Sequence, residues 1–493
     1  MRGRDKRDHV HTHYTARRAA TAGQIIAAGI QVGVSPVMST HQTRDVTTIR
    51  WEPQPLAAEL VAELLKTFTT ISPWLRQFAG RLREETGTRL ADWVDHIVVG
   101  DGGIASRLQA AGFVRDQSDG ATLWKNDLGI FPSIVVCDDE PSQLSLKVES
   151  IADFVLAGNL AGRAVIEGDP LAAVRRARVD EHEGFECWVI ERHGSRGLEP
   201  ETIEPERANA ILRHAESLRL RQRHFETTRD GFEHASRLIA RAVDDLGVAR
   251  TCDLFFQSER EYWQSRNRAA RIQKARQDRL GLGWANHDHH TYRSSREAFT
   301  SLVAVLEQLG FVCRERFYAG ETAGWGAQVL EQPDCGIVIF ADVDLAPDEV
   351  LGDFAHEPLA ARDELGTVGL WCRLHGEAFL EAGMHHLECQ FDFDAARSQL
   401  QDIGVSTMEP FTNLPYLRQA FTKGEMWPVA EERIEPLLID GLISNDAAER
   451  FRHEGALGSH LEILERNDGY KGFNQSGIDE IILKTDPRRE AAT

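Results

Sequence analysis

One pattern of hydrophobic and polar positions occurs three times along the chain. A short apolar segment with a histidine is followed by a segment with apolar residues at i, i+3 and i+4, a glycine that ends the helix, and further apolar segments. The repeats start around residues 95, 288 and 385, at WVDHIVV, NHDHHTY and GMHHLECQFDF. Their spacing predicts a strand, a helix and then further strands in each repeat, with His96, His289 and His386 near the start of the first strand.

Tandem repeats of this kind predict an α+β fold in which βαβββ modules form curved mixed sheets around a shared cavity. The expected parts are a flexible or mis-annotated N-terminal segment (residues 1–50), a degenerate βαβββ-like module (51–200), a helical connector (201–280) and a half that holds the candidate site (281–484). A signal or transit peptide is the alternative for the first segment. In the connector we expect one or two amphipathic helices, whose charged residues form a solvated face, and one strand, VARTCDLFF.

Length, composition and charge narrow the class of protein. The chain has 493 residues, 42% of them hydrophobic, and a net charge of −21, which indicates a globular protein of about two to four domains. The negative charge disfavours nucleic acid and anionic membrane surfaces as partners, and no apolar run is long enough to cross a membrane. Seven widely spaced cysteines without a Cys-x-x-Cys pair predict neither disulfides nor a cysteine zinc site, so we expect a cytoplasmic protein.

The repeated histidines are the first candidates for chemistry. A single histidine on a strand is more often part of the core than a ligand, but paired modules bring their equivalent first strands together. Two histidines and one carboxylate from a last strand then form the facial triad of non-haem Fe(II) oxygen chemistry. The carboxylate is expected in GSHLEILER, where Glu462 and Glu465 lie on opposite faces of the strand, and periodicity alone does not choose between them.

Several short motifs in residues 281–467 match one known family. An arginine, Arg293, follows His289 by four residues, and His386 opens a strand as His-Leu. Further along are a Leu-Arg-Gln stretch with a lysine four residues past the glutamine (Leu417 to Lys423) and a Glu-Ile-x-x-Arg pattern that starts at Glu462. In these motifs the chain resembles the 2-oxoadipate dioxygenase/decarboxylase family, also called 2-hydroxyglutarate synthase, of the vicinal-oxygen-chelate superfamily.

The resemblance implies a site and a reaction. It implies Fe(II) bound by His289, His386 and Glu462, a substrate carboxylate bound by Arg293, and Arg418 as a second basic residue that acts on the substrate. The partners would be a small 2-oxo acid and O₂, and the reaction would convert 2-oxoadipate to 2-hydroxyglutarate and CO₂, a step of lysine catabolism. Two alternatives stay open: a metal-dependent isomerase or lyase of the same fold, and a non-catalytic protein that binds small molecules.

The first repeat has its own histidine, His96, and a carboxylate at Glu149. They allow either a second metal site or a degenerate module retained as a packing surface. We favour the degenerate module because similarity of fold does not by itself imply a site.

Overall fold

The computed structural model describes residues 49–116, 122–362, 364–474 and 486–488. By its internal contacts the chain divides into residues 1–45 and residues 46–493. The predicted N-terminal segment, residues 1–50, therefore lies almost entirely outside the described residues. The second unit consists of two halves, each with one mixed β-sheet.

The first sheet consists of two successive βαβββ modules. Its strand order is β2-β3-β4-β1-β5-β8-β7-β6, so the first strand of each module lies in the middle, parallel to the last strand of the same module. The first module contains β1 (Val94–Val99), α3 (Ile104–Ala110), β2 (Val114–Asp116), β3 (Thr122–Lys125) and β4 (Ser133–Val136). The second contains β5 (Ser142–Lys147), α4 (Ile151–Ala157), β6 (Val165–Glu167), β7 (Val174–His182) and β8 (Phe185–Arg192).

The second sheet repeats this topology, with the order β10-β11-β12-β9-β13-β17-β15-β14 and β16 paired to β17. Its first module contains β9 (His287–Arg293), α9 (Phe299–Gln308), β10 (Val312–Tyr318), β11 (Trp325–Gln332) and β12 (Ile337–Asp344). Its second contains β13 (His386–Gln390), α11 (Phe393–Asp402), β14 (Thr412–Leu414), β15 (Leu417–Phe421), β16 (Glu425–Trp427) and β17 (Ala456–Arg466). The predicted α+β fold of tandem βαβββ modules with curved mixed sheets is confirmed.

Residues 51–200 contain two of these modules, where the sequence pattern showed one. The segment LSLKVES follows the first repeat in the sequence and includes most of β5, which opens the second module. In β5 a glutamine, Gln143, stands at the register position that His386 occupies in β13. Because the sequence repeat was recognised by its histidines, this module had no signal of its own.

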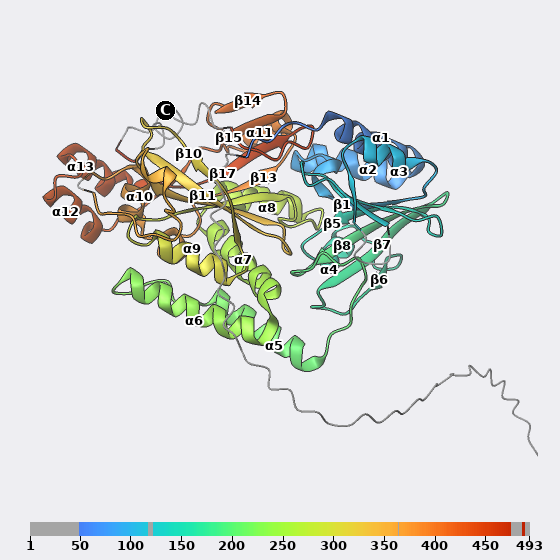
Figure 1. The fold of residues 1–493 in the computed structure, drawn as a ribbon, viewed down its shortest axis with the longest axis horizontal. Helices are drawn as coiled ribbons and strands as arrows, with labels where there is room; N and C mark the ends of the chain where they lie inside the picture. The colour runs from blue at the N-terminus through green and yellow to red at the C-terminus, as the bar shows by residue number, and fades with distance from the viewer. Residues whose placement is uncertain (1–48, 117–121, 363, 475–485, 489–493) are drawn as a thin grey trace, which may run out of the picture. The chain divides into compact units, whose positions relative to one another are not determined.

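Helices cover one face of each sheet and form the two largest cores (Figure 1). Before β1 the chain forms α1 (Pro55–Ile71), α2 (Pro73–Arg81) and the short helices η1 (Leu82–Thr86) and η2 (Leu90–Trp93). The Ser72 side chain caps α2 by accepting a hydrogen bond from the Leu75 amide. Insertions in the second half add η3 (Glu349–Leu351), α10 (Thr367–His375), η4 (Ala378–Ala382), α12 (Glu431–Ile439) and α13 (Asn445–Glu454).

Throughout its described residues, the stretch between the halves contains helices and no strand. The prediction of a strand at VARTCDLFF is therefore wrong. Residues 201–280 form α5 (Pro205–Arg219), α6 (Thr228–Leu246), α7 (Val248–Ser265) and α8 (Arg268–Asp278). In α7 the residues Cys252, Phe255, Phe256 and Glu259 are buried. Their i, i+3, i+4 and i+7 spacing places them on one helix face against the core of the second half, which outweighs the strand preference of the aromatic residues.

All seven cysteines are free thiols. Within the described part of the chain, no helix is both long enough and apolar enough to cross a membrane.

Candidate metal centre

A small cavity of about 60 Å³ lies on the inner face of the second sheet, between the central strands β9, β13 and β17. This volume has room for about four water molecules. Aromatic side chains enclose it on one side: Phe317, Trp325, Phe340, Phe411, Phe421 and Phe473. The lining thus combines aromatic side chains with polar and charged side chains, most of which come from strands of the sheet.

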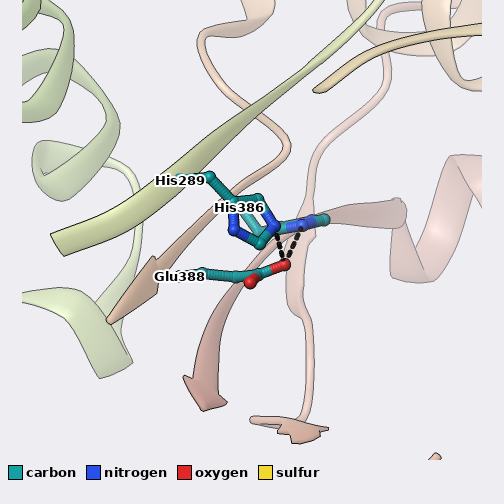
Figure 2. A group of neighbouring side chains, drawn as sticks. All are labelled: His289, His386 and Glu388. Carbon is teal, nitrogen blue, oxygen red and sulfur yellow. Dashed lines mark ion pairs between the residues drawn. The ribbon is translucent and has the colours of Figure 1, made fainter. Parts of the chain in front are cut away.

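Two histidines from neighbouring strands point into this cavity (Figure 2). His289 of β9 and His386 of β13 are 2% and 8% exposed, and burial lowers the pKa of His289 to about 4 and that of His386 well below its usual value. Both imidazoles are therefore neutral at physiological pH, as metal ligation requires. Of the other histidines on β9, His290 lies on the helix-covered side, where its ring contacts Phe256, and His287 lines a different cavity.

A glutamate completes a cluster with these histidines. Glu388 follows His386 by two residues on β13, so both side chains lie on the same face of the strand. One donor atom from each of His289, His386 and Glu388 lies within 4.8 Å of the other two, and Figure 2 shows both imidazoles turned toward one Glu388 oxygen. The other oxygen, Oε2, is buried without a hydrogen-bond partner among the described residues. Sequence analysis missed Glu388, although its spacing from His386 was the available signal.

The predicted carboxylate, Glu462, lies beside this cluster. It is on β17 directly next to Glu388, and its Oε2 is 3.3 Å from His386 Nε2. Gln419 Nε2 donates a hydrogen bond of 2.9 Å to the other oxygen of Glu462, which orients the carboxylate. Glu465 faces the opposite side of the sheet and accepts a hydrogen bond from the Phe393 amide. The structure thus places Glu462 in the cavity and Glu465 outside it.

The two glutamates are held close together in a buried site. Burial raises the pKa of Glu462 to about 7. Burial and the neighbouring charge of Glu462 raise the pKa of Glu388 well above its usual value. A divalent cation would remove this repulsion, and two neutral imidazoles with carboxylates form a donor set suited to Fe(II), Mn(II), Co(II), Ni(II) or Zn(II). The residues present therefore fit a divalent metal.

The ion pair between Asp288 and Arg466 contacts the Nδ1 side of the His289 ring. Asp288 Oδ1 is 3.0 Å from His289 Nδ1, and the Arg466 guanidinium binds Asp288 through two hydrogen bonds of 2.9 and 3.0 Å. Although burial opposes it, the Arg466 charge holds the pKa of Asp288 well below its usual value. An ionised Asp288 accepts the Nδ1 proton of His289 and leaves Nε2 free as a ligand atom.

The predicted carboxylate-binding residue, Arg293, also lines the cavity. It is 1% exposed, and its Nε and Nη1 groups have no hydrogen-bond partner among the described residues. Its neighbour on β12 is Asp342, whose pKa burial raises to about 8, so this carboxyl is largely protonated at neutral pH. Arg293 thus presents unpaired hydrogen-bond donors beside the proposed ligands, which suits an anionic substrate group.

Arg418 lies elsewhere. Its guanidinium binds the Asp394 carboxylate at 2.7 and 2.8 Å on the outer surface, and it is not among the residues that line the cavity. Its neighbour Gln419 points inward instead, because successive residues of a strand face opposite sides. The expectation that Arg418 acts on the substrate is not supported by this geometry.

The first half contains the same histidine–aspartate–arginine contacts as the second half, but its described residues lack the other proposed metal ligands. His96 Nδ1 is 2.6 Å from Asp95 Oδ1, and Arg192 binds Asp95 through two hydrogen bonds of 2.8 Å, as Arg466 binds Asp288. By strand register the positions of His386, Glu388 and Glu462 are occupied there by Gln143, Ser145 and Trp188. Among the described residues, no cluster with metal-binding geometry includes His96 or Glu149, and Glu149 pairs with Lys274 at 3.3 Å.

Comparison with known proteins adds little to this picture. No protein-family model and no curated protein matches the chain. A mutant of 4-hydroxymandelate synthase from Streptomyces coelicolor is similar at 13% identity and a TM-score of 0.28, over 81% of this chain and 99% of that one. Methylmalonyl-CoA epimerase from Mycobacterium tuberculosis is similar at 13% identity and a TM-score of 0.22, over 37% of this chain and 88% of that one. The protein YdcJ from Shigella flexneri is similar at 12% identity and a TM-score of 0.23, over 53% of this chain and 83% of that one. With TM-scores this low, the fold assignment depends on the strand order of the chain itself.

Proposed function

We propose that this protein is a metal-dependent enzyme that uses O₂ to decarboxylate a 2-oxo acid, with 2-oxoadipate as substrate and 2-hydroxyglutarate and CO₂ as products. The main support is the convergence of His289, His386 and Glu388 within 4.8 Å, with Glu462 3.3 Å from His386, in one buried cavity. Two neutral imidazoles and a carboxylate on one side of an Fe(II) ion leave positions open for a substrate and for O₂.

The proposed ligands are His289, His386 and Glu462. Glu388 adds a second carboxylate on the same face, so the charge of a divalent ion would be balanced within the cluster. When bound, iron(II) would supply the redox chemistry that couples O₂ reduction to oxidation of the 2-oxo acid. Asp288 and Gln419 then act as positioning residues, because each holds one proposed ligand by a hydrogen bond.

The proposed substrate site is next to Arg293. Its guanidinium has no hydrogen bond to any described residue, so one of its edges is free to donate two hydrogen bonds to one substrate carboxylate. The surrounding phenylalanines exclude water, which strengthens this charged contact. We expect Arg293→Gln to raise the KM for the 2-oxo acid by about 10- to 100-fold while metal binding stays the same, because a charge-assisted pair of hydrogen bonds is lost.

Oxygen uptake tests the reaction. Protein loaded with Fe(II) without air is mixed with 2-oxoadipate and then with O₂, and the expected result is O₂ consumption with release of one CO₂ for each 2-hydroxyglutarate formed. Uptake at the rate without enzyme, over a panel of 2-oxo acids, contradicts the proposed reaction. Bound metal without uptake would instead favour an isomerase or lyase, and a protein that binds neither metal nor 2-oxo acid would contradict the enzyme altogether.

A matched pair of variants tests the ligand assignment. Glu462→Gln is expected to lower the affinity for Fe(II) by at least about 100-fold, because a charged ligand becomes a neutral amide. Glu465→Gln, three positions along the same strand and on its other face, is expected to leave the affinity unchanged. Equal metal affinity in the two variants, measured by competition with a chelator, would show that Glu462 is not a ligand.

A further inference from the structure

A second cavity, larger than the one beside His289 and His386, lies apart from these histidines. It has a volume of about 750 Å³, within the range of small-molecule sites. One wall is the inner face of the first sheet, with His96, Lys147 and Ile190, and the opposite wall is formed by α7, α8 and Trp284. It shares with the small cavity only the position of the first histidine, because His96 is the counterpart of His289, and its lining also includes His287 and Gln390 of the second half.

Two basic side chains in this cavity lack proper partners. Arg260 of α7 is 6% exposed, its Nε has no hydrogen-bond partner among the described residues, and the carboxylate oxygen nearest to that Nε is Glu149 Oε1 at 3.9 Å. Its Nη1 makes only a long contact of 3.4 Å with His290 Nε2. Lys147, at the end of β5, has no hydrogen bond or ion pair to any described residue. Burial also lowers the pKa of Lys147, although the nearby Asp95 and Asp92 favour its charged form.

The acidic groups of the cavity are engaged or lie at its edge. Asp95 is bound by Arg192, and Glu149 is paired with Lys274. Asp92 is bound by Arg89, and Asp253 accepts a hydrogen bond of 2.9 Å from Gln257. The other three acidic residues of the lining are exposed to solvent: Asp153, Glu261 and Asp334. At the position of Lys147 the second half has Gln390, which donates a hydrogen bond to Asp288. The first half thus has a free positive charge where the second half has a neutral, paired side chain.

We propose that this cavity binds a small organic acid, whose carboxylate lies between Lys147 and Arg260 and whose apolar body packs against Trp284, Ile190 and Phe131. Arg260 is buried with an unpaired Nε, which is costly unless an anion compensates its charge, and the partly exposed Lys147 adds a second unpaired positive charge to the same cavity. The apolar side chains on the walls favour an organic molecule over inorganic phosphate, and the acidic edge disfavours a highly charged one. This site is separate from the metal cluster and does not depend on the function proposed for it.

Calorimetric titration of the metal-free, full-length protein with hexanoate tests the site. Hexanoate has one carboxylate and an apolar chain, and it lacks the 2-oxo group. We expect saturable binding of one hexanoate per chain, binding of the neutral analogue hexanamide at least about tenfold more weakly, and no competition by inorganic phosphate. No saturable hexanoate binding up to millimolar concentrations, or equal binding of hexanoate and hexanamide, overturns the proposal.

Variants locate the bound acid. Lys147→Gln removes a charge that has no partner in the protein, so we expect it to fold and to weaken hexanoate binding by at least about tenfold. Lys125→Gln is the matched control, because Lys125 lines the same cavity but binds Asp116 at 2.8 Å, and its binding should match the parent. Arg293→Gln should also bind hexanoate as the parent does. Binding that is lost in Arg293→Gln and kept in Lys147→Gln would place the acid in the other cavity and overturn the proposal.

Discussion

At the scale of single residues, burial has opposite effects on the imidazoles and the carboxyls of the metal cluster. It lowers the pKa of His289 to about 4, which keeps the ring neutral, and raises the pKa of Glu462 to about 7. The carboxyl of Asp342 is raised in the same way to about 8. A divalent cation would favour ionised carboxylates and neutral imidazoles together. Without a cation, ionising the buried carboxyls costs free energy.

This difference predicts how the stability of the metal-free protein depends on pH. A carboxyl with a raised folded-state pKa binds its proton more tightly in the folded state, so its stabilising effect is lost as pH rises through that pKa. A histidine with a lowered pKa has the opposite effect, but that effect is complete above the unfolded pKa of about 6.5. Between pH 6.5 and 8.5 we therefore expect Glu462 and Asp342 to reduce the free energy of unfolding by about 2–3 kcal/mol.

Thermal melting of metal-free protein across this range checks the prediction. The Asp342→Asn variant imitates the protonated carboxyl and should show a smaller fall in Tm between pH 6.5 and 8.5. Saturating divalent metal should also reduce the fall. A Tm that is constant or rises over this range in the metal-free parent would show that the buried carboxyls are already ionised.

Some of the site could be predicted residue by residue, and some could not. Strand alternation correctly separated Glu462 from Glu465 as facing opposite sides, but it did not say which side is the interior. The motif match drew attention to Leu417-Arg418-Gln419, yet the residue that reaches the cavity is Gln419. Which of two neighbours faces inward depends on the pairing of β15 with β17, and a local motif does not contain that information.

At the scale of elements, the strand that carries His289 and its counterpart in the first half each pair with the next module through a shift in register. The pairing of β9 with β13 shifts register between Leu387 and Cys389, opposite His289, and the pairing of β1 with β5 shifts between Val94 and His96. Such a bulge lets an aspartate and the following histidine contact each other beside the last strand, where Arg466 or Arg192 binds the aspartate. The two halves therefore allow a comparison of the same aspartate–arginine pair beside a histidine, with the other proposed metal ligands in the second half and without them in the first.

The comparison of the two halves predicts that Asp288, but not Asp95, affects metal affinity. Asp288→Asn should weaken metal binding by about 10- to 100-fold, because His289 loses the acceptor that orients its ring. The equivalent change in the first half, Asp95→Asn, should leave metal affinity unchanged. Both variants leave an arginine without its anion, so both should lower Tm, and the difference between them isolates the effect on the metal. Metal affinity that falls equally in both variants would contradict a role of Asp288 in positioning the ligand.

The elements that the sequence did not predict have physical explanations. The segment VARTCDLFF has aromatic and β-branched residues, but its burial at i, i+3, i+4 and i+7 against the second core makes it part of α7. The module that begins at β5 lacks the histidine by which the other repeats were found. Helices with regular apolar spacing, such as α9 and α11, were predicted correctly because local pattern and packing agree there.

At the scale of the whole molecule, the chain consists of two similar sheets with different cavities. The second sheet has two histidines and two glutamates in a small cavity, and the first has the same supporting ion pair beside a larger cavity with unpaired basic groups. The net charge of −21 disfavours anionic ligands in general, so a small acid would depend on local charges. Composition and length allowed several domains, but they contained no information on which half holds the cluster of His289, His386 and Glu388.

The central claim is that one metal binds in the second half, on His289, His386 and Glu462. Anomalous diffraction at the iron absorption edge, from crystals loaded with Fe(II) without air, tests it most directly. We expect a single peak per chain, at about 2.0–2.3 Å from the Nε2 atoms of both histidines and from a Glu462 oxygen. A peak next to His96, or none within bonding distance of His289 and His386, would contradict the account.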